Sequence, residues 1–266
     1  MTGSMIVVKL GGTEGVDFSA ICADALEILK QVQKLVLVHG GSAEANALGE
    51  ALGQPPRFIT SPSGYTSRYT DRKTLEIFLM AVNGKVNSLL GEQLHRLGLN
   101  ALGLSGLDGR LMQATRKDSI QSIENGKRKI IRDDYTGKIE QVNSGLLGLL
   151  LDAGYLPVRA PVAVSLQGEA LNVDADRAAA MLAAALQAET LILLTAVPGL
   201  MKNFPDESSL IRQLTQAQLP AALEAAQGRM KKKVLGAEEV GKVIIADGRI
   251  QNPITNAING NGTVIQ

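Results

Sequence analysis

The strongest constraint on the fold comes from two short apolar segments that both end in paired glycines. Residues 5–12 read Met-Ile-Val-Val-Lys-Leu-Gly-Gly, and residues 34–42 read Lys-Leu-Val-Leu-Val-His-Gly-Gly-Ser. Continuous apolar, β-branched runs of this length predict buried strands. The residues between them show helical spacing after Asp17, which predicts a helix with Asp17 as its N-cap. This β-α-β-α order is typical of a doubly wound, mainly parallel α/β sheet.

The rest of the chain continues in the same style after an irregular middle. Pro55-Pro56 interrupts the pattern, and the turn formers in residues 57–70 predict a hairpin or lid. We expect helices over 70–97, 144–153, 174–186, 215–226 and 230–240. We expect strands over 101–104 (a third central strand), 111–115, 128–132, 156–159, 162–166, 169–171, 190–194, 243–246 and 263–265. Residues 125–126, Asn-Gly, predict a tight turn between ribbons.

Composition excludes several classes of function. The 27 basic and 26 acidic residues nearly cancel, aromatic residues make up 3% and there is no Trp, which argues against nucleic acid and membrane partners. Cys22 is the single cysteine, so an internal disulfide is excluded; we expect it in the core of a cytoplasmic protein. No apolar run reaches the roughly 18 residues of a membrane span. The four residues before the first strand leave no room for a signal peptide.

The paired glycines predict a place for phosphate oxygens. Gly11, Gly12, Gly40 and Gly41 can offer backbone N–H donors at the carboxyl ends of neighbouring strands. Tight βα turns alone explain these glycines equally well. Lys9 favours the phosphate site, because a lysine on an apolar strand needs an anionic partner. No Walker or Rossmann glycine pattern is present, and the two histidines fit no metal site; we interpret His39 as a hydrogen-bonded strand end.

Two further polar clusters lie in the second half of the chain. Residues 228–233, Gly-Arg-Met-Lys-Lys-Lys, open a predicted helix, where the helix dipole favours anions. A solvated helix face is the simpler alternative for this lysine run. In residues 172–176, Asn-Val-Asp-Ala-Asp, Asn172 is a candidate helix cap and Asp174 suits the first turn. Asp176 is then left without a structural explanation.

Six motifs in order resemble the amino acid kinase family. They are Lys-x-Gly-Gly (9–12), His-Gly-Gly (39–41), Gly-Leu-Ser-Gly-x-Asp-Gly (103–109), Leu-Asn-Val-x-Ala-Asp (171–176), Leu-Leu-Thr-x-Val-Pro-Gly (193–199) and Gly-x-Met-x-x-Lys (228–233). Within the family the chain is most similar to acetylglutamate kinases. The stretches 55–58, 67–78 and 134–137 narrow the likeness to a lysine-pathway branch that phosphorylates 2-aminoadipate held on the amino-group carrier protein LysW.

The resemblance implies a fold and a reaction. The fold is a three-layer αβα sandwich around an open, mainly parallel sheet, with residues 1–170 as the acyl-acceptor half and 171–266 as the nucleotide-binding half of one continuous sheet. ATP would phosphorylate a carboxylate, with Mg²⁺ bound through the nucleotide, in a homodimer. Lys9 and Lys233 would stabilise the transferring phosphoryl group, Asp176 would hold both lysines, and Gly11, Gly12, Gly40 and Gly41 would donate N–H groups. Arg68 and Asn172 match the positions that hold the acceptor.

Two local features favour a carrier-linked acceptor. Free-substrate kinases read roughly Gly-Leu-Arg-Val-Thr-Asp where residues 64–71 read Gly-Tyr-Thr-Ser-Arg-Tyr-Thr-Asp, so this lid is longer by two residues. Residues 110–132 contain seven basic and two acidic residues, a local charge of +5 (7 − 2). That basic ribbon suits an acidic carrier, with Lys117, Lys127, Arg128, Lys129 and Arg132 as docking candidates. A solvated hairpin is the alternative. Acetylglutamate kinase and a non-catalytic nucleotide-binding regulator remain competing functions.

Overall fold

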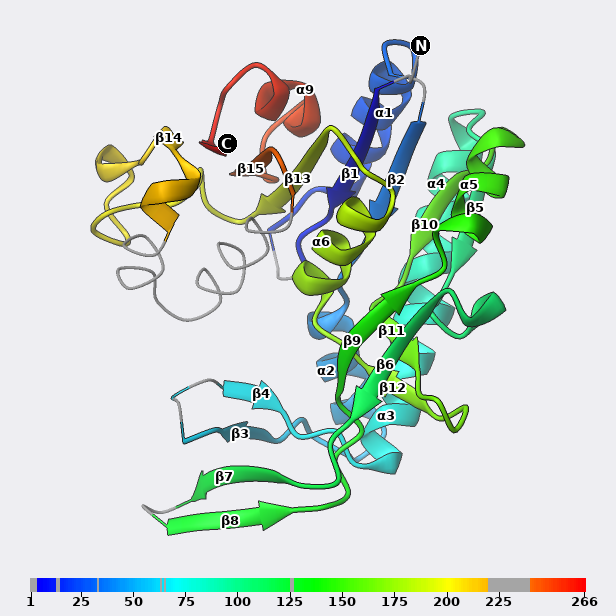
Figure 1. Cartoon of the computed structure of the whole chain (residues 1–266), viewed down its shortest axis with the longest axis vertical. Coiled ribbons are helices and arrows are strands. Elements are labelled where there is room, and N and C mark those ends of the chain that lie inside the picture. Colours follow the sequence, from blue (N-terminus) through cyan, green and yellow to red (C-terminus); the bar gives the residue numbers. More distant parts are fainter. Residues whose placement is uncertain are drawn as a thin grey trace.

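A computed structural model describes residues 4–12, 15–32, 34–62, 64, 66–124, 127–219 and 240–266. Its largest sheet has eight strands in the order β14-β16-β15-β13-β1-β2-β10-β5 (Figure 1). The strand bounds are β1 (Met5–Lys9), β2 (Lys34–Val38), β5 (Ala101–Leu104), β10 (Leu156–Arg159), β13 (Thr190–Thr195), β14 (Gln213–Leu214), β15 (Val243–Asp247) and β16 (Thr263–Ile265). The strands of the two paired-glycine segments are therefore neighbours near the middle of this sheet.

Strand directions confirm the predicted α/β class. β1 runs parallel to both β2 and β13, and β10 runs parallel to β2 and β5. β15 continues this parallel run beside β13, and β16 is antiparallel to β15. The prediction of β5 as a central strand was wrong, because β10 pairs with β2 on one side and leaves β5 at the edge. Apolar patterning identifies a strand but does not give its place in the sheet.

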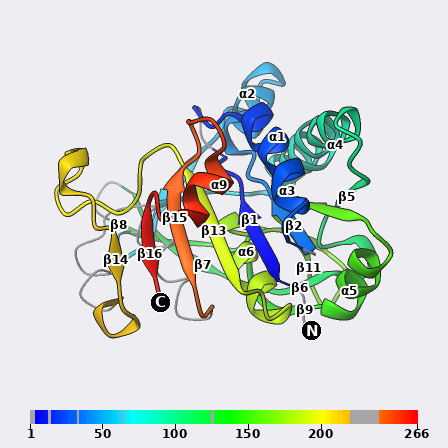
Figure 2. The ribbon, with the colours of Figure 1, turned by 90° about the horizontal axis from the view of Figure 1, so that it is seen from above.

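Helices cover both faces of the sheet and complete three layers (Figure 2). The first face packs against α1 (Phe18–Leu29), α4 (Asn87–Arg96) and α9 (Pro253–Ile258). The second packs against α5 (Ser144–Asp152) and α6 (Ala175–Ala185). Asp17 caps α1 as predicted, accepting from the backbone N–H groups of Ser19 and Ala20. Cys22 lies in the core, as expected, and burial raises the pKa of its thiol to about 11.

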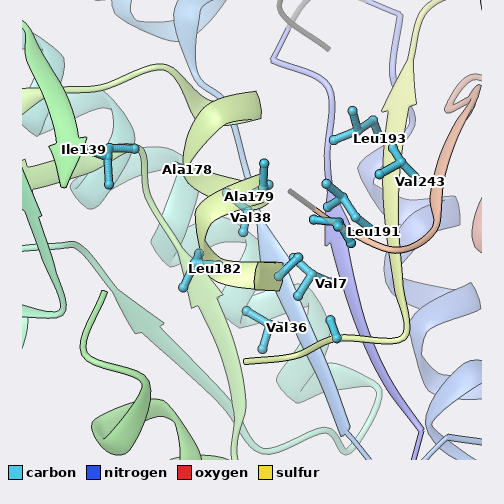
Figure 3. Packing of buried hydrophobic residues seen from close by; sticks show 14 of the residues in the cluster. Val7, Val36, Val38, Ile139, Ala178, Ala179, Leu182, Leu191, Leu193 and Val243 are labelled. Carbon is cyan, nitrogen blue, oxygen red and sulfur yellow. The ribbon is translucent and has the colours of Figure 1, made fainter. Parts of the chain in front are cut away.

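Alternation along β1 decides which face receives the lysine. Ile6, Val8 and Leu10 lie in the cluster with α1, whereas Val7 lies in the cluster with α6 (Figure 3). Successive side chains of a strand point to opposite faces. Lys9 therefore follows Val7 onto the α6 face, at the carboxyl end of the strand.

A smaller sheet extends the molecule below the first. It contains β12 (Ala170–Asn172), β11 (Val162–Val164), β6 (Met112–Arg116) and β9 (Gly137–Val142), in that order. Beside it lie α2 (Ser42–Ala51), α3 (Arg72–Leu79) and a π-helical turn, η1 (Met80–Val86), which leads into α4. The predicted helix over 70–97 is thus one continuous run with a π segment, and it begins after the N-cap Asp71.

Two hairpins project side by side from this lower region (Figure 1). The lid hairpin consists of β3 (Phe58–Thr60) and β4 (Thr66–Arg68), and the basic hairpin of β7 (Ile120–Glu124) and β8 (Lys127–Ile131). Each forms its own two-stranded sheet, and β3 contacts β7. The lid and the basic ribbon predicted from the sequence are therefore neighbours, although about fifty residues separate them in the chain.

The predicted helices over 215–226 and 230–240 fall mostly outside the described residues. Of the first, the structure describes a short 3-10 turn, η4 (Gln216–Gln218), and Gly228 and Lys233 lie outside. Two other 3-10 turns are η2 (Asp108–Arg110) and η3 (Glu207–Ser209). The sequence did not predict α9 or β14. Within the described ranges, no helix has both the length and the apolar character needed to span a membrane.

Candidate active site

Lys9 forms a buried ion pair at the carboxyl end of β1. Its Nζ lies 2.8 Å from Oδ1 of Asp176, and the two side chains are 8% and 12% exposed. Asp176 lies in the first turn of α6, whose N-cap is Asp174. The cap is therefore Asp174 and not Asn172, because the Asp174 carboxylate accepts from the backbone N–H groups of Asp176 and Arg177. The lysine expected to need an anion meets the carboxylate that the sequence left unexplained.

The two glycine loops touch each other backbone to backbone. A Cβ placed on Gly12 would lie 2.8 Å from Cα of Gly40, and a Cβ on Gly40 would lie 2.5 Å from Cα of Gly12. A Cβ on Gly11 would meet a methyl carbon of Val16 at 2.6 Å. Any other residue would force these segments apart. Glycine is required here so that the two strand ends can place backbone N–H groups close together.

The second glycine loop continues directly into a helix N-terminus. Gly41 is the N-cap of α2, and no side chain of the described residues caps this end by a hydrogen bond. A Cβ on Gly41 would lie 2.6 Å from Cγ1 of Val82, so this glycine is also required by packing. Open N–H groups and the helix dipole make such a terminus favourable for anions. We call Lys9, the glycine loops and this terminus the phosphoryl cluster, after the role that the family resemblance implies for them.

His39 makes a hydrogen bond to the backbone of the second glycine loop. It is fully buried, and Nδ1 lies 2.6 Å from the carbonyl oxygen of Gly40. Burial lowers the pKa of His39 to about 4, so the ring is neutral near pH 7. A carbonyl can only accept, so Nδ1 carries the proton and donates it. This confirms the interpretation of His39 as a hydrogen-bonded strand end.

Arg68 crosses from the lid hairpin to the first turn of α2. Its Nη2 donates to the carbonyl oxygen of Ser42 at 3.2 Å and to Oδ1 of Asn46 at 2.5 Å. The guanidinium also lies over the ring of Phe58, 5.5 Å from its centroid. The side chain is buried. A cation from the lid therefore stands beside the same helix terminus that the glycine loop opens.

Asn172 joins the lid through Thr70. Its Nδ2 donates to Oγ1 of Thr70 at 3.1 Å, and that hydroxyl donates to the carbonyl oxygen of Arg68 at 3.2 Å. Arg68 and Asn172, expected to act together, are thus linked by one buried threonine. We call Arg68, Thr70 and Asn172 the acceptor cluster.

The basic hairpin is separate from both clusters. Lys127, Arg128 and Lys129 are exposed on β8. Lys117 precedes β7 and Arg132 follows β8, so both lie at the base of the hairpin. They line a cleft of about 490 Å³ that also includes Arg116 and Glu169. The hairpin is tied to the lid by Tyr69, whose hydroxyl donates to Oδ2 of Asp133 at 2.6 Å. The five docking candidates lie on β8 or just beyond the ends of β7 and β8, whereas Arg68 lies on β4 and Lys9 on β1.

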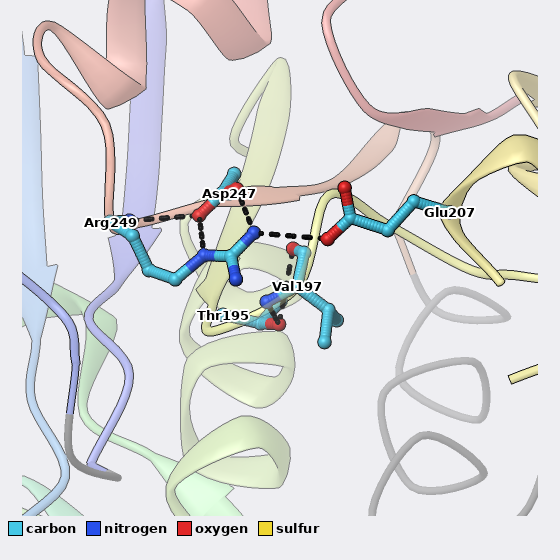
Figure 4. A network of polar contacts seen from close by, with 5 residues as sticks. All are labelled: Thr195, Val197, Glu207, Asp247 and Arg249. Carbon is cyan, nitrogen blue, oxygen red and sulfur yellow. Dashed lines mark hydrogen bonds and ion pairs between the residues drawn. The ribbon is translucent and has the colours of Figure 1, made fainter. Parts of the chain in front are cut away.

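The second half contributes the strand ends beside β1. Thr195 ends β13, and its hydroxyl accepts from the backbone N–H of Val197 at 3.1 Å, which shapes the Thr-x-Val-Pro-Gly turn (Figure 4). Arg249 donates to both carboxylate oxygens of Asp247, at 2.8 and 2.6 Å, and to Glu207 at 3.4 Å. These hydrogen bonds raise the pKa of Arg249 above its usual range. Lys233, the second predicted catalytic lysine, lies outside the described residues.

Sequence reasoning missed three buried polar residues near the site. Thr70 and Asp134 join the segments of the acceptor cluster, and Arg159 ends β10. Arg159 donates to the carbonyl oxygens of Ala160 and Val162, and burial lowers its pKa to about 9. The signal for Asp134 was the Asp-Tyr-Thr-Gly stretch, used above only for resemblance. Nothing in the apolar context of Arg159 indicates an inward-facing guanidinium.

Comparison with known proteins identifies the class. The model of the amino acid kinase family matches residues 4–243. The chain therefore belongs to the amino acid kinase family. The motifs at 9–12 and 39–41 contribute to the phosphoryl cluster, the motif at 171–176 contains Asn172 and Asp176, and the motif at 193–199 forms the turn after β13. The motif at 228–233 lies outside the described residues.

Particular relatives narrow the comparison. The chain is 58% identical to the LysW-aminoadipate kinase of Deinococcus radiodurans over 267 residues, covering 98% of this chain and 91% of that protein. It is 53% identical to the LysW-aminoadipate kinase of Thermus thermophilus, covering 98% and 100%. A Nitrosopumilus maritimus relative, 38% identical over 98% and 99%, is described as a putative LysW-aminoadipate/LysW-glutamate kinase.

Solved structures confirm the fold. Carbamate kinase from Giardia lamblia bound to AMP-PNP superposes with a TM-score of 0.68 at 17% identity, over 99% of this chain and 98% of the other. The smu.665 protein of Streptococcus mutans gives a TM-score of 0.73 at 25% identity, over 98% of both chains. The predicted three-layer sandwich is therefore the fold of this family.

Proposed function

We propose that this chain transfers the γ-phosphoryl group of ATP to the side-chain carboxylate of 2-aminoadipate carried on LysW, in lysine biosynthesis. The observation that carries the proposal is the Lys9–Asp176 pair, 2.8 Å apart, beside the contact of Gly12 with Gly40. This arrangement places a lysine and two glycine loops at the carboxyl ends of the neighbouring strands β1 and β2. The high identity to LysW-aminoadipate kinases supports the choice of acceptor.

The proposed chemistry needs no general base. A carboxylate oxygen attacks the γ-phosphorus, the bond from that phosphorus to the β–γ bridging oxygen breaks, and ADP leaves with the electron pair. The carboxylate is already ionised near pH 7, so no proton must be removed. Catalysis is then positioning and charge neutralisation. Lys9 stabilises the transferring group, Asp176 orients Lys9, and Gly11, Gly12, Gly40 and Gly41 donate N–H groups. Lys233 is proposed as the second stabilising lysine.

Mg²⁺ is proposed to enter with the nucleotide. Among the described residues, no three His, Cys, Asp or Glu side chains gather closely enough to hold a metal ion. The phosphoryl cluster instead presents an ammonium and backbone N–H groups, which suit phosphate oxygens. When bound, the cation would neutralise phosphate charge. Residues 171–266 are proposed as the nucleotide-binding half and residues 1–170 as the acceptor half.

The acceptor is proposed to lie between the lid and α2. Arg68 can bind both oxygens of an α-carboxylate through its planar fork, and Asn172 can bind the adjoining amide. Arg68 belongs to the lid and bonds the first turn of α2, whereas Asn172 bonds Thr70, which follows the lid. The lid is longer by two residues than in free-substrate kinases, and the added residues are proposed to enlarge it where the amino substituent lies. A larger lid suits an acceptor attached to a protein.

The basic hairpin is proposed as the LysW docking surface. Lys127, Arg128 and Lys129 form an exposed basic strand, and Lys117 and Arg132 border the cleft at its base. Ile130, 55% exposed on the same strand, adds apolar contact area. An acidic carrier would be steered by this charge. We also propose a cytoplasmic homodimer, which the family resemblance and the single cysteine favour.

A comparison of acceptors tests the function. ADP release is measured with LysW-linked aminoadipate, LysW-linked glutamate, free acetylglutamate and no acceptor. The proposal expects the highest kcat/KM with LysW-linked aminoadipate. Glutamate lacks one methylene, so its discrimination should be modest, about 10- to 200-fold. Preference for acetylglutamate would indicate the arginine-pathway alternative, and ADP release that ignores every acceptor would contradict phosphoryl transfer.

A further inference from the structure

Asp134 is a buried carboxylate at the exit of the basic hairpin, 3% exposed. Oδ1 accepts from the backbone N–H of Thr70 at 2.9 Å. Oδ2 accepts from the backbone N–H of Thr136 at 3.1 Å and from the Thr136 hydroxyl. A carboxylate has enough lone pairs for these three donors, whereas a neutral amide does not. The three donors therefore favour a carboxylate over an amide at this position.

Asp134 lies beside both segments that carry the acceptor cluster. The backbone N–H of Tyr135 donates to the carbonyl oxygen of Thr70 at 2.7 Å, and that of Asn172 donates to the carbonyl oxygen of Tyr135 at 2.9 Å. Three segments, 68–70, 133–136 and 170–172, therefore lie side by side. Asp134 is in the middle one, and its carboxylate reaches Thr70, which bonds both Asn172 and the backbone of Arg68.

Arg116 supports the same segment from the opposite side. Its guanidinium lies 3.7 Å from the ring centroid of Tyr135, and its Nε donates to the carbonyl oxygen of Asp134 at 2.9 Å. Nη1 pairs with Glu169 at 3.1 Å, and Nη2 donates to the carbonyl oxygen of Arg132 at 3.3 Å. Arg116 thus bonds the chain where it leaves the basic hairpin, and the same side chain holds the middle segment through Asp134 and Tyr135.

We propose that Asp134 is a positioning residue for the acceptor, acting through Thr70 on Asn172 and on the lid strand that carries Arg68. Arg116 is its second support. The carboxylate does not touch the acceptor; it fixes the backbone of Thr70, whose hydroxyl bonds the side chain of Asn172 and the backbone carbonyl of Arg68. This inference rests on the proposed function, because it assumes that Arg68 and Asn172 bind the acceptor.

Steady-state kinetics of three variants, two at Thr70 and one at Asp134, test it. Thr70→Val keeps the shape but removes the hydroxyl, whereas Thr70→Ser keeps the hydroxyl. Asp134→Asn keeps the volume but removes the charge and one acceptor. We expect Thr70→Val and Asp134→Asn to raise KM for LysW-linked aminoadipate about 5- to 20-fold with KM for ATP unchanged, and Thr70→Ser to stay within about twofold. Asp152→Asn is the matched control, because Asp152 is an exposed carboxylate that pairs with Lys34 at the start of β2.

The double variant sharpens the result. Thr70→Val combined with Asp134→Asn should cost no more than the larger single effect, because both act on one path. Equal increases of KM for ATP and acceptor, or multiplicative losses in the double variant, would overturn the inference in favour of a general folding role. If Asp134→Asn does not fold, the Thr70 pair still decides the outcome.

Two outcomes separate this inference from the function. Arg68→Met and Asn172→Ala should each raise the acceptor KM by at least tenfold. If they do and the Thr70 and Asp134 variants do not, the inference fails and the function stands. If Arg68→Met and Asn172→Ala leave acceptor KM unchanged while ADP is still released, the acceptor assignment itself is wrong.

Discussion

The phosphoryl cluster and the basic hairpin are built by opposite means. Lys9 ends a strand that is paired on both sides in the eight-stranded sheet, and it is 6% exposed. The basic hairpin is a two-stranded sheet of its own, and Lys127, Arg128, Lys129 and Ile130 on β8 are all exposed. The first region is fixed by the core, whereas the second is held by the contact of β7 with β3 and by contacts at its base, among them those of Arg116.

Under the proposed function, this difference places the two tasks of the enzyme in different parts of the chain. Phosphoryl transfer depends on groups held in one geometry, so a buried, doubly paired strand end suits it. Recognition of a carrier depends on a surface that can vary without disturbing the core. Residues 133–136 connect the basic hairpin to the acceptor cluster, because they follow the hairpin and bond Thr70 and Asn172.

The largest effect is expected from Lys9→Met. Removal of the ammonium should lower kcat by about 10³-fold, because a preorganised charge beside the transferring group is lost. The buried Asp176 carboxylate then loses the ammonium with which it pairs, which should also destabilise the fold. Lys9→Met with Asp176→Asn should recover stability but not activity. Activity by ADP release and stability by urea unfolding check this, and wild-type kcat in either variant would refute the assignment.

A smaller effect is expected from Gly40→Ala. The new Cβ would lie 2.5 Å from Cα of Gly12, so the glycine loops must separate and their N–H groups move. We expect kcat to fall about 10²-fold. Gly91→Ala is the matched control: it lies within α4 with nothing within 4 Å of a Cβ, so it should stabilise the protein by roughly 0.5–1 kcal/mol at full activity. Equal activities of the two variants would mean that the glycine contact is not functional.

The same contrast explains what the sequence could reveal. Apolar runs, glycine pairs and caps located β1, β2, α1 and α6, because local patterning and burial decide those elements. The pairing of Lys9 with Asp176 was expected only from the family resemblance, because local patterning left Asp176 unexplained. Position within the sheet was harder: β5 is an edge strand because β10 takes the inner place, and no local signal encodes that choice.

Long-range polar contacts were beyond sequence reasoning for a related reason. Thr70, Asp134 and Asn172 span about a hundred residues, and each looks like an ordinary turn or strand-end residue in isolation. Asn172 could satisfy an N-cap, yet Asp174 does so, and this frees Asn172 to bond Thr70. Only the fold decides which of two nearby polar side chains takes a local role and which a tertiary one.

Charge reversal on the basic hairpin should alter carrier recognition and leave chemistry intact. Lys127→Glu with Arg128→Glu should raise KM for LysW-linked aminoadipate about tenfold at low salt and flatten its salt dependence, with kcat at saturation unchanged. Lys202→Glu with Arg212→Glu, two exposed basic residues of the other half, is the matched control. Unchanged affinity at low ionic strength in the hairpin variant would remove the docking assignment. A fall in kcat would show that the two regions are less independent than their packing suggests.

The last prediction concerns His39, which bonds the second glycine loop. The pH dependence of the free energy of unfolding reports how well the core keeps this ring from water. The His39 pKa is lowered to about 4 in the folded chain by burial, while the unfolded chain titrates near 6.5. Between these values the unfolded state binds a proton that the folded state refuses, so stability falls as pH drops from 6.5 toward 4, by at most on the order of 3 kcal/mol. His39→Asn keeps a donor in the place of Nδ1 but cannot titrate, so urea unfolding should lose this part of its pH dependence. His95→Asn, at an exposed position on α4, should keep the wild-type profile. A wild-type slope in His39→Asn would mean that the loop opens readily enough to hydrate the ring, and the contrast with the hairpin would then be one of degree.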